Sequence, residues 1–307
     1  MIGGEAFGQG CDDCGDCSCY SHAAADCCCD PLWTATADVL VLRRDVIDDV
    51  PLVIDPGSGA VLYNSQDIDL DFQAAPRVSI ARHLIGRHAI EFEFFGVNSL
   101  TDAATVATPG AQFTVYGATF GTAPINMRFD SSLYSYELNW KSSWFCDRVK
   151  MVAGFRWLEL DDDATVQDAG SPPQLFVGSV DNNLFGFQWG IEGTLIKRRR
   201  LEIKAGWKGG VYSNTANFDA AFPQAGPAAV FQAGGKTTAY VGEVKIGLNY
   251  QLTNCLALRA GYQMMYIKGV ALLPEQLDDL AAPLLGEAQM GGRPIYHGYH
   301  LGLQYDF

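Results

Sequence analysis

From Trp33 to the C-terminus, the sequence repeats one unit: a segment in which apolar and polar residues alternate, followed by a break. A period of two residues is the pattern of a β-strand whose two faces meet different surroundings. No helical period competes over a comparable length, except in LPEQLDDLAAPLL within residues 272–285. The alternating segments are residues 33–44, 67–82, 88–98, 128–142, 148–161, 183–197, 200–213, 237–252, 255–268 and 295–307. The sequence therefore predicts an all-β protein.

The breaks between these segments alternate in length. Residues 83–87, 143–147, 198–199 and 253–254 form short turns, whereas residues 45–66, 99–127, 162–182, 214–236 and 269–294 form long loops. If successive strands are antiparallel neighbours, every long loop lies at the same end of the sheet. Transmembrane barrels have this asymmetry, with short periplasmic turns and long external loops. We expect a transmembrane antiparallel up-and-down β-barrel of about ten strands, or twelve, over residues 31–307.

The stretch AIEFEFFG, residues 89–96, shows the two faces that such a strand presents. Ile90, Phe92 and Phe94 lie on one face, and Glu91 and Glu93 lie on the other. A soluble β-sandwich, the alternative fold, would bury the apolar face, whereas a membrane barrel turns it toward lipid. Aromatic residues gather near both ends of the strands, as in the two aromatic belts of membrane barrels, and favour the barrel. These residues are Trp33, Trp140, Tyr250, Tyr305 and Phe307 at one end, and Phe94, Trp157, Phe185 and Tyr266 at the other.

In a barrel of this kind the polar faces of the strands line the lumen, and here they carry acids and bases in similar numbers. Eight strands give an interior that side chains fill, whereas about 16–18 leave an open channel. Ten strands therefore predict a narrow, porin-like channel for ions or small solutes with a charge-paired lumen. The alternative is a plugged structural or surface-interaction barrel that acts through its external loops. The predicted pore-lining residues are Glu91, Glu93, Glu137, Lys141, Arg156, Glu192, Lys204, Lys208, Glu243, Lys245 and Arg259.

Five stretches, in this order, carry a resemblance to one protein family: WTATADVLVLRR, VAGFRWLELDDD, NNLFGFQWGIEGTLI, LRAGYQMMYIKGVAL and YHGYHLGLQYDF. Together they resemble the porin-like outer-membrane β-barrel proteins of planctomycete-type bacteria. The resemblance implies an outer-membrane location and a pore role, and it implies no catalytic residue. The final strand ends with Phe307, and this terminal aromatic residue resembles the signal read by outer-membrane assembly machinery. We therefore expect membrane lipid and that machinery as partners.

Other features restrict the function further. The net charge of −14 argues against a nucleic-acid partner, because few bases are present to neutralise phosphates. The start, MIGGEAFGQG, shows no export signal, which counts against an outer-membrane location. Residues 1–30 are expected to form a flexible periplasmic tail that contains Cys11, Cys14, Cys17, Cys19, Cys27, Cys28 and Cys29. Some of these cysteines have metal-ligand spacing, but disulfides or free thiols explain them better, and we expect no metal or cofactor.

An enzyme is not expected. His297, at the start of the last strand, and Asp161–Asp163, at the end of the fifth, would lie on opposite sides of the ring. No Gly-rich phosphate loop or nucleophile motif is present in the sequence.

Overall fold

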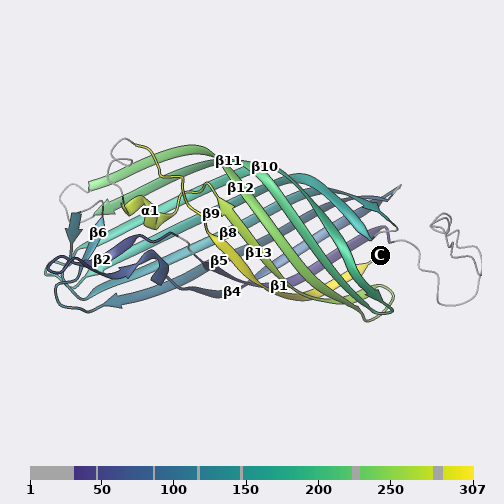
Figure 1. Ribbon diagram of the computed structural model, residues 1–307, viewed down its shortest axis with the longest axis horizontal. Coiled ribbons are helices and arrows are strands. Elements are labelled where there is room, and N and C mark those ends of the chain that lie inside the picture. Colours follow the sequence, from purple (N-terminus) through teal and green to yellow (C-terminus); the bar gives the residue numbers. More distant parts are fainter. Residues whose placement is uncertain are drawn as a thin grey trace, which may run out of the picture.

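The computed structural model describes residues 31–45, 48–85, 87–115, 118–145, 148–222, 229–278 and 286–307. Ten strands pair in the ring order β1-β14-β13-β12-β11-β10-β9-β8-β5-β4 and close into a barrel (Figure 1). Every pairing in the ring is antiparallel. The ring strands are β1 (Trp33–Asp45), β4 (Leu70–Leu84), β5 (His88–Val106), β8 (Ile125–Trp144), β9 (Val149–Asp168), β10 (Leu175–Arg198), β11 (Leu201–Phe222), β12 (Ala229–Gln251), β13 (Leu256–Lys268) and β14 (Ile295–Asp306). The predicted up-and-down barrel of ten strands is confirmed.

The connections at one end of the barrel are short, as the sequence predicted, and we call this the turn end. The opposite end, which we call the loop end, carries a second sheet in the order β3-β2-β6-β7 and one short helix (Figure 1). These elements are β2 (Pro51–Asp55), β3 (Ala60–Asn64), β6 (Gln112–Val115), β7 (Ala118–Phe120) and α1 (Leu273–Asp278), and the turn η2 (Ser65–Asp67) follows β3. The helix lies where the sequence pattern allowed one. No helix in the described part of the chain is long and apolar enough to cross a membrane.

The prediction of a long loop was wrong for two segments. Residues 162–182 and 214–236 mostly continue the strands, and β9 pairs with β10 without interruption from Val149 to Gln167. The apolar side of these strands changes at this level, because the outward face becomes polar, with Asp161 and Asp163, while the inward face becomes mostly apolar. Since the apolar outer face was part of the strand signal, each strand was predicted to end where that face ends. The real strands extend beyond it.

The outward face closer to the turn end is apolar and exposed. On β10, Phe185, Phe187, Trp189 and Ile191 all point outward and are about half exposed. In AIEFEFFG, Ile90 and Phe92 are also exposed. An exposed apolar surface that continues around the ring indicates a surface that contacts lipid. Ile90, Phe92 and Phe94 therefore face outward, whereas Glu91, Glu93 and the buried Phe95 face the interior.

The interior of the loop end is filled by a continuous apolar core. Leu52 and Val53 of β2 and Phe113 of β6 are buried there. Leu273 and Leu277 of α1 pack into the same core. Strand β6 therefore contributes to this core through Phe113. The predicted tail, residues 1–30, lies outside the described residues.

Candidate functional site in the barrel lumen

The inward-facing side chains change character along the barrel axis. On β9, the inward residues from the turn end are Lys150, Val152, Arg156, Leu158 and Leu160. Strand β12 follows the same order, from Asn249 through Lys245 and Glu243 to Val241 and Ala239. The lumen therefore has three levels: a polar vestibule at the turn end, a charged layer, and the apolar core.

The charged layer is centred on Arg156, whose side chain is 1% exposed. Its Nη1 lies 2.7 Å from Glu243 Oε2, and its Nε lies 3.4 Å from Glu137 Oε1. Lys208 Nζ lies 2.6 Å from the other oxygen of Glu137. Ser135 Oγ accepts a further hydrogen bond from Arg156 Nε at 2.9 Å. These contacts connect β8 and β9 with β11 and β12, so side chains fill this level of the lumen.

A second set of ion pairs crosses the lumen next to Arg156. Lys245 Nζ lies 2.8 Å from Glu93 Oε1 and 2.6 Å from Glu243 Oε1. Arg77 donates to Asp38 Oδ2 through Nε at 2.9 Å and Nη2 at 2.6 Å. Its Nη1 donates to Gln263 Oε1 at 2.7 Å. These side chains come from β1, β4, β5, β12 and β13, and so complete the layer around the ring.

The side chains nearer the turn end are more accessible to water. Lys141 Nζ lies 2.8 Å from Glu91 Oε1 and 3.0 Å from Glu192 Oε1, and the Glu192 side chain is 34% exposed. Lys204 contacts Glu202 at 3.0 Å and is 42% exposed. The vestibule is therefore accessible to water. The exposed fraction of the side chain falls from 34% at Glu192 to 1% at Arg156.

The charges of the charged layer and of the Lys141 cluster balance. Each has a partner of opposite sign at 2.6–3.6 Å. The six acids are Asp38, Glu91, Glu93, Glu137, Glu192 and Glu243, and the six bases are Arg77, Lys141, Arg156, Lys208, Lys245 and Arg259. Pairing is what permits such charges to be buried, because an unpaired buried charge is strongly destabilising.

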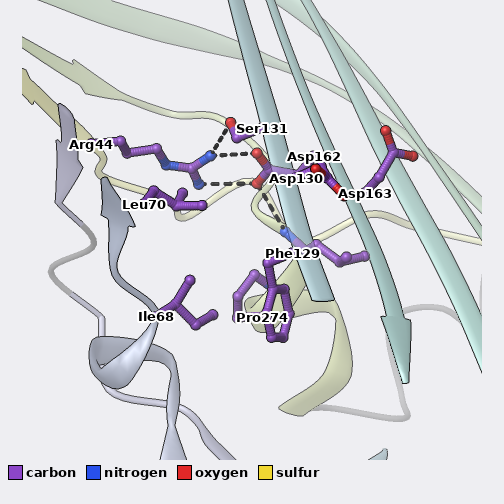
Figure 2. Close-up of a pocket in the computed structure, with 10 residues that line it drawn as sticks. Arg44, Ile68, Leu70, Phe129, Asp130, Ser131, Asp162, Asp163 and Pro274 are labelled. Carbon is purple, nitrogen blue, oxygen red and sulfur yellow. Dashed lines mark hydrogen bonds and ion pairs between the residues drawn. The ribbon is translucent and has the colours of Figure 1, made fainter. Parts of the chain in front are cut away.

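One further ion pair lies among the apolar residues of the loop end (Figure 2). Arg44 reaches from β1 across the interior to Asp162 of β9, and its Nη2 donates to Asp162 Oδ2 at 3.0 Å. Its Nη1 donates to Ser131 Oγ at 2.6 Å. Both charged side chains are almost fully buried. The sequence did not predict this pair, because Arg44 ended its predicted strand and Asp162 fell in a predicted loop.

All eleven predicted lumen residues lie on inward-facing positions, with Lys204 near the rim. Whether they line a pore stays a prediction. The predicted pore-lining set left out Asp38, Arg77, Asn139, Gln188 and Gln263, which belong to the same charged layer. Their strand positions on the polar face were the signal that could have identified them.

The structure does not bring His297 together with Asp161–Asp163. His297 lies on the outer face, where its Nε2 is 3.0 Å from Asp45 Oδ2 and its Nδ1 is 2.9 Å from the Tyr262 hydroxyl. Burial, and then the charges of Asp181 and Glu159, raise the pKa of Asp161 to about 6. Over the described ranges, no group of three or more His, Cys, Asp or Glu side chains is arranged to hold a metal ion.

No family model matches the chain, and no curated protein sequence matches it. Among solved structures, the chain is similar to the outer membrane protease OmpT from Escherichia coli, with 9% identity, a TM-score of 0.51, and coverage of 90% of this chain and 96% of that chain. It is less similar to the toluene transporter TbuX from Ralstonia pickettii, with 9% identity, a TM-score of 0.36 and coverage of 90% and 89%. The chain therefore has the fold of an outer-membrane β-barrel. The resemblance to the planctomycete-type family stays a prediction.

Proposed function

We propose that this protein is an outer-membrane β-barrel closed along its axis, and that it acts through its surface at the loop end. The apolar core is the observation that carries this proposal. Leu40, Leu133, Leu158 and Leu184 point inward from four strands and are completely buried. Ions cross such a layer only if it is hydrated, and these four side chains have no surface that water can reach.

The paired charges support the same conclusion. A ring of charged side chains of one sign is one common basis of ion selectivity in a pore. Here the twelve charged side chains of the charged layer and the Lys141 cluster neutralise one another. Their role in the proposal is to hold opposite walls of the barrel together. The narrow channel predicted from the sequence is the second candidate, and the water-accessible vestibule around Glu192 and Lys204 favours it.

The surface above the apolar belt is the part that would meet a partner. Asp130, Asp161, Asp163, Asp181 and Asp219 face outward from β8, β9, β10 and β11. Asp161 pairs directly with Asp181 in the sheet, and Asp130 pairs with Asp163. An acidic sheet surface attracts cationic groups. We infer a basic partner, with no catalytic role for the barrel, and a place in the outer membrane of a planctomycete-type bacterium.

Single-channel conductance in a planar bilayer tests this proposal, on refolded protein first shown to be membrane-embedded. We expect no discrete conductance steps from the unmodified protein. The double variant Glu91→Ala/Glu93→Ala should also stay silent but lose stability. Glu159→Ala removes an acid from the outer face of β9 and serves as the matched control, with neither effect. Discrete steps from the unmodified protein would contradict the closed barrel and favour the narrow channel.

A further inference from the structure

The turn end lies opposite the end that carries β2, β6 and α1 (Figure 1). It is basic, although the whole chain has a net charge of −14. Seven exposed bases lie in or directly beside three of its hairpin turns, and we call them the basic rim: Arg82, Arg87, Arg148, Lys197, Arg198, Arg199 and Arg200. Lys197 pairs with Glu202 at 3.0 Å. The other six have no acid partner among the described residues.

The three turns of the basic rim are neighbours. They connect β4 to β5, β8 to β9 and β10 to β11, and these six strands follow one another in the ring. The Ser143 N–H donates to Arg87 O at 2.9 Å, and the Thr194 N–H donates to Arg148 O at 2.8 Å. These hydrogen bonds join each turn to the next hairpin. The bases therefore lie along one arc of the turn end.

Each of the three turns holds a bulky residue in left-handed backbone. The φ angle is 66° at Arg87, 51° at Phe145 and 37° at Arg199. Over the described ranges, only four residues other than glycine have a positive φ, and these are three of them. Glycine or asparagine adopts this conformation with less strain. Arginine and phenylalanine at such positions indicate that the side chains themselves are used.

Exposed apolar side chains accompany the bases. Ile85 is 98% exposed and Phe145 is 75% exposed, and both lie in turns of the basic rim. Trp144 and Leu195, next to the same turns, are also exposed. A surface that joins bases to exposed apolar residues is typical of protein segments that lie in the membrane interface.

The basic rim continues directly from the apolar belt. Ile196 of β10 pairs with Ile203 of β11, and Arg198 pairs with Leu201. Because these pairs are two residues apart, they lie on the same outward face. The face therefore changes from apolar to basic within two residues. Such a change is expected where a strand leaves the hydrocarbon region and enters the headgroup region.

The β4–β5 hairpin shows the same boundary. The guanidinium of Arg82 lies 5.4 Å from the centre of the Trp33 ring. Tryptophan is enriched at the membrane interface, where one part of the ring is apolar and another part meets polar groups. Arg82 is therefore at headgroup height while its stem contacts the belt.

We propose that the basic rim binds the phosphate headgroups of anionic phospholipids in the leaflet at the turn end. Arginine suits this role, because its guanidinium can donate two parallel hydrogen bonds to one phosphate. A soluble anionic partner would match the charge, but it would not explain the exposed Ile85 and Phe145 or the direct continuation from the apolar belt. The inference goes beyond the proposed function, because it concerns the opposite end and holds for a closed barrel and a narrow channel alike.

The test measures which lipids surround the barrel. The protein is refolded into vesicles of phosphatidylcholine and phosphatidylglycerol, and electron paramagnetic resonance of spin-labelled lipids gives the association constant of each lipid. We expect a preference of roughly threefold for phosphatidylglycerol at low salt. Sodium chloride at about 1 M should abolish this preference, because the Debye length then falls to about 3 Å. A preference that is absent at low salt, or unchanged by salt, would overturn the proposal.

The β10–β11 turn offers the sharpest variant. Arg198→Gln/Arg199→Gln/Arg200→Gln removes three bases, and the preference should fall at least about twofold. Arg198→Lys/Arg199→Lys/Arg200→Lys keeps the charge and should retain most of the preference. A folded glutamine variant with the full preference would overturn the proposal.

The matched control removes three bases from the loop end. Arg128→Gln/Lys236→Gln/Lys268→Gln changes the net charge equally and should keep the preference, whereas an equal loss would show that net charge acts and not the basic rim. If the glutamine variant of the β10–β11 turn does not fold, Arg87→Gln/Arg148→Gln tests the other two turns, and a lower preference is expected. Inorganic phosphate should not compete at matched ionic strength. Competition would mean that the rim takes free phosphate, which would also contradict lipid binding.

Discussion

Lys245 of β12 and Glu93 of β5 form an ion pair at 2.8 Å, although their strands stand five places apart in a ring of ten. Strands in that relation lie on opposite walls of the barrel. A single pair of side chains therefore spans the lumen and brings the two walls together. Lys245 also contacts Glu243, so this link is continuous with the buried Arg156 cluster.

Removing both partners of this link should cost less than the sum of the costs of removing each alone. Glu93→Ala leaves the Lys245 charge facing the lumen with one partner fewer, and we expect a loss of about 1–3 kcal/mol in the free energy of unfolding. Lys245→Ala should cost a similar amount. The double variant should lose clearly less than the sum, as measured by denaturant unfolding in lipid vesicles. Additive losses would show that the two side chains are not coupled.

Arg156 should be the most sensitive position of the charged layer. Arg156→Met leaves Glu137 and Glu243 short of a buried partner, and a loss of about 3–5 kcal/mol is expected. Arg128→Met breaks the pair with Asp130 at the surface, where Arg128 is 61% exposed, and should cost no more than about 1 kcal/mol. Equal losses for the two variants in the same unfolding experiment would contradict a structural role for the charged layer.

The boundary of the hydrocarbon region along the barrel axis can be located with two residues of a single strand. Phe187 and Asp181 lie on the same outward face of β10, Phe187 within the apolar belt and Asp181 above it. Phe187→Arg should destabilise the barrel in lipid by about 2–4 kcal/mol, because a charge would enter the hydrocarbon region. Asp181→Arg should change stability by less than about 1 kcal/mol. Similar losses at the two positions would mean that the belt does not mark the hydrocarbon boundary.

The attachment of α1 should depend on pH through Glu275. Burial, and then the neighbouring carboxyl of Asp48, raise the pKa of Glu275 to about 8, against the lowering effect of Arg293 and Arg44. Because this folded-state pKa exceeds the ordinary value of 4.5, the folded protein holds a proton that the unfolded chain releases. Stability should therefore fall as pH rises from about 4.5 to about 8 and be unaffected by this group outside that window.

Glu275→Gln should flatten this dependence, as measured by thermal unfolding in detergent between pH 5 and 8. Glu287→Gln, in the segment that follows α1, is the matched control and should keep it. A pH profile that Glu275→Gln does not change would show that the carboxyl pair does not govern the attachment of α1.

The role of Phe307 in assembly can be separated from a role in stability. Its backbone N–H donates to Trp33 O at 2.9 Å, and its carbonyl accepts from the Trp33 N–H at 2.7 Å. Phe307→Ala keeps both bonds and removes only an exposed ring, so stability should change by less than about 0.5 kcal/mol. We expect slower assembly into outer membranes, seen as a smaller heat-modifiable fraction on gels. Tyr305→Ala is the control, and equal assembly of both variants would contradict an assembly signal.

The sequence by itself determined the number and order of the barrel strands and the faces of most of them. These follow from period-two alternation and from turn length, which are local properties of the chain. The inward position of Glu91 and Glu93 needed only the pattern AIEFEFFG and the loop asymmetry. The short turns were located correctly for the same reason.

Only the tertiary structure decided which charges meet and how far the strands extend. Glu93 and Lys245 are 152 residues apart, and no local pattern brings them together. The continuation of the strands through residues 162–182 and 214–236 was not predicted, because the outward face there is polar and lacks the apolar residues by which the strands were recognised. Arg44 and Asp162 form an ion pair because the barrel brings β1 and β9 to opposite sides of the interior at the loop end. Ring closure places distant side chains opposite each other, and their pairing depends on the width of the lumen, which is a property of the whole barrel.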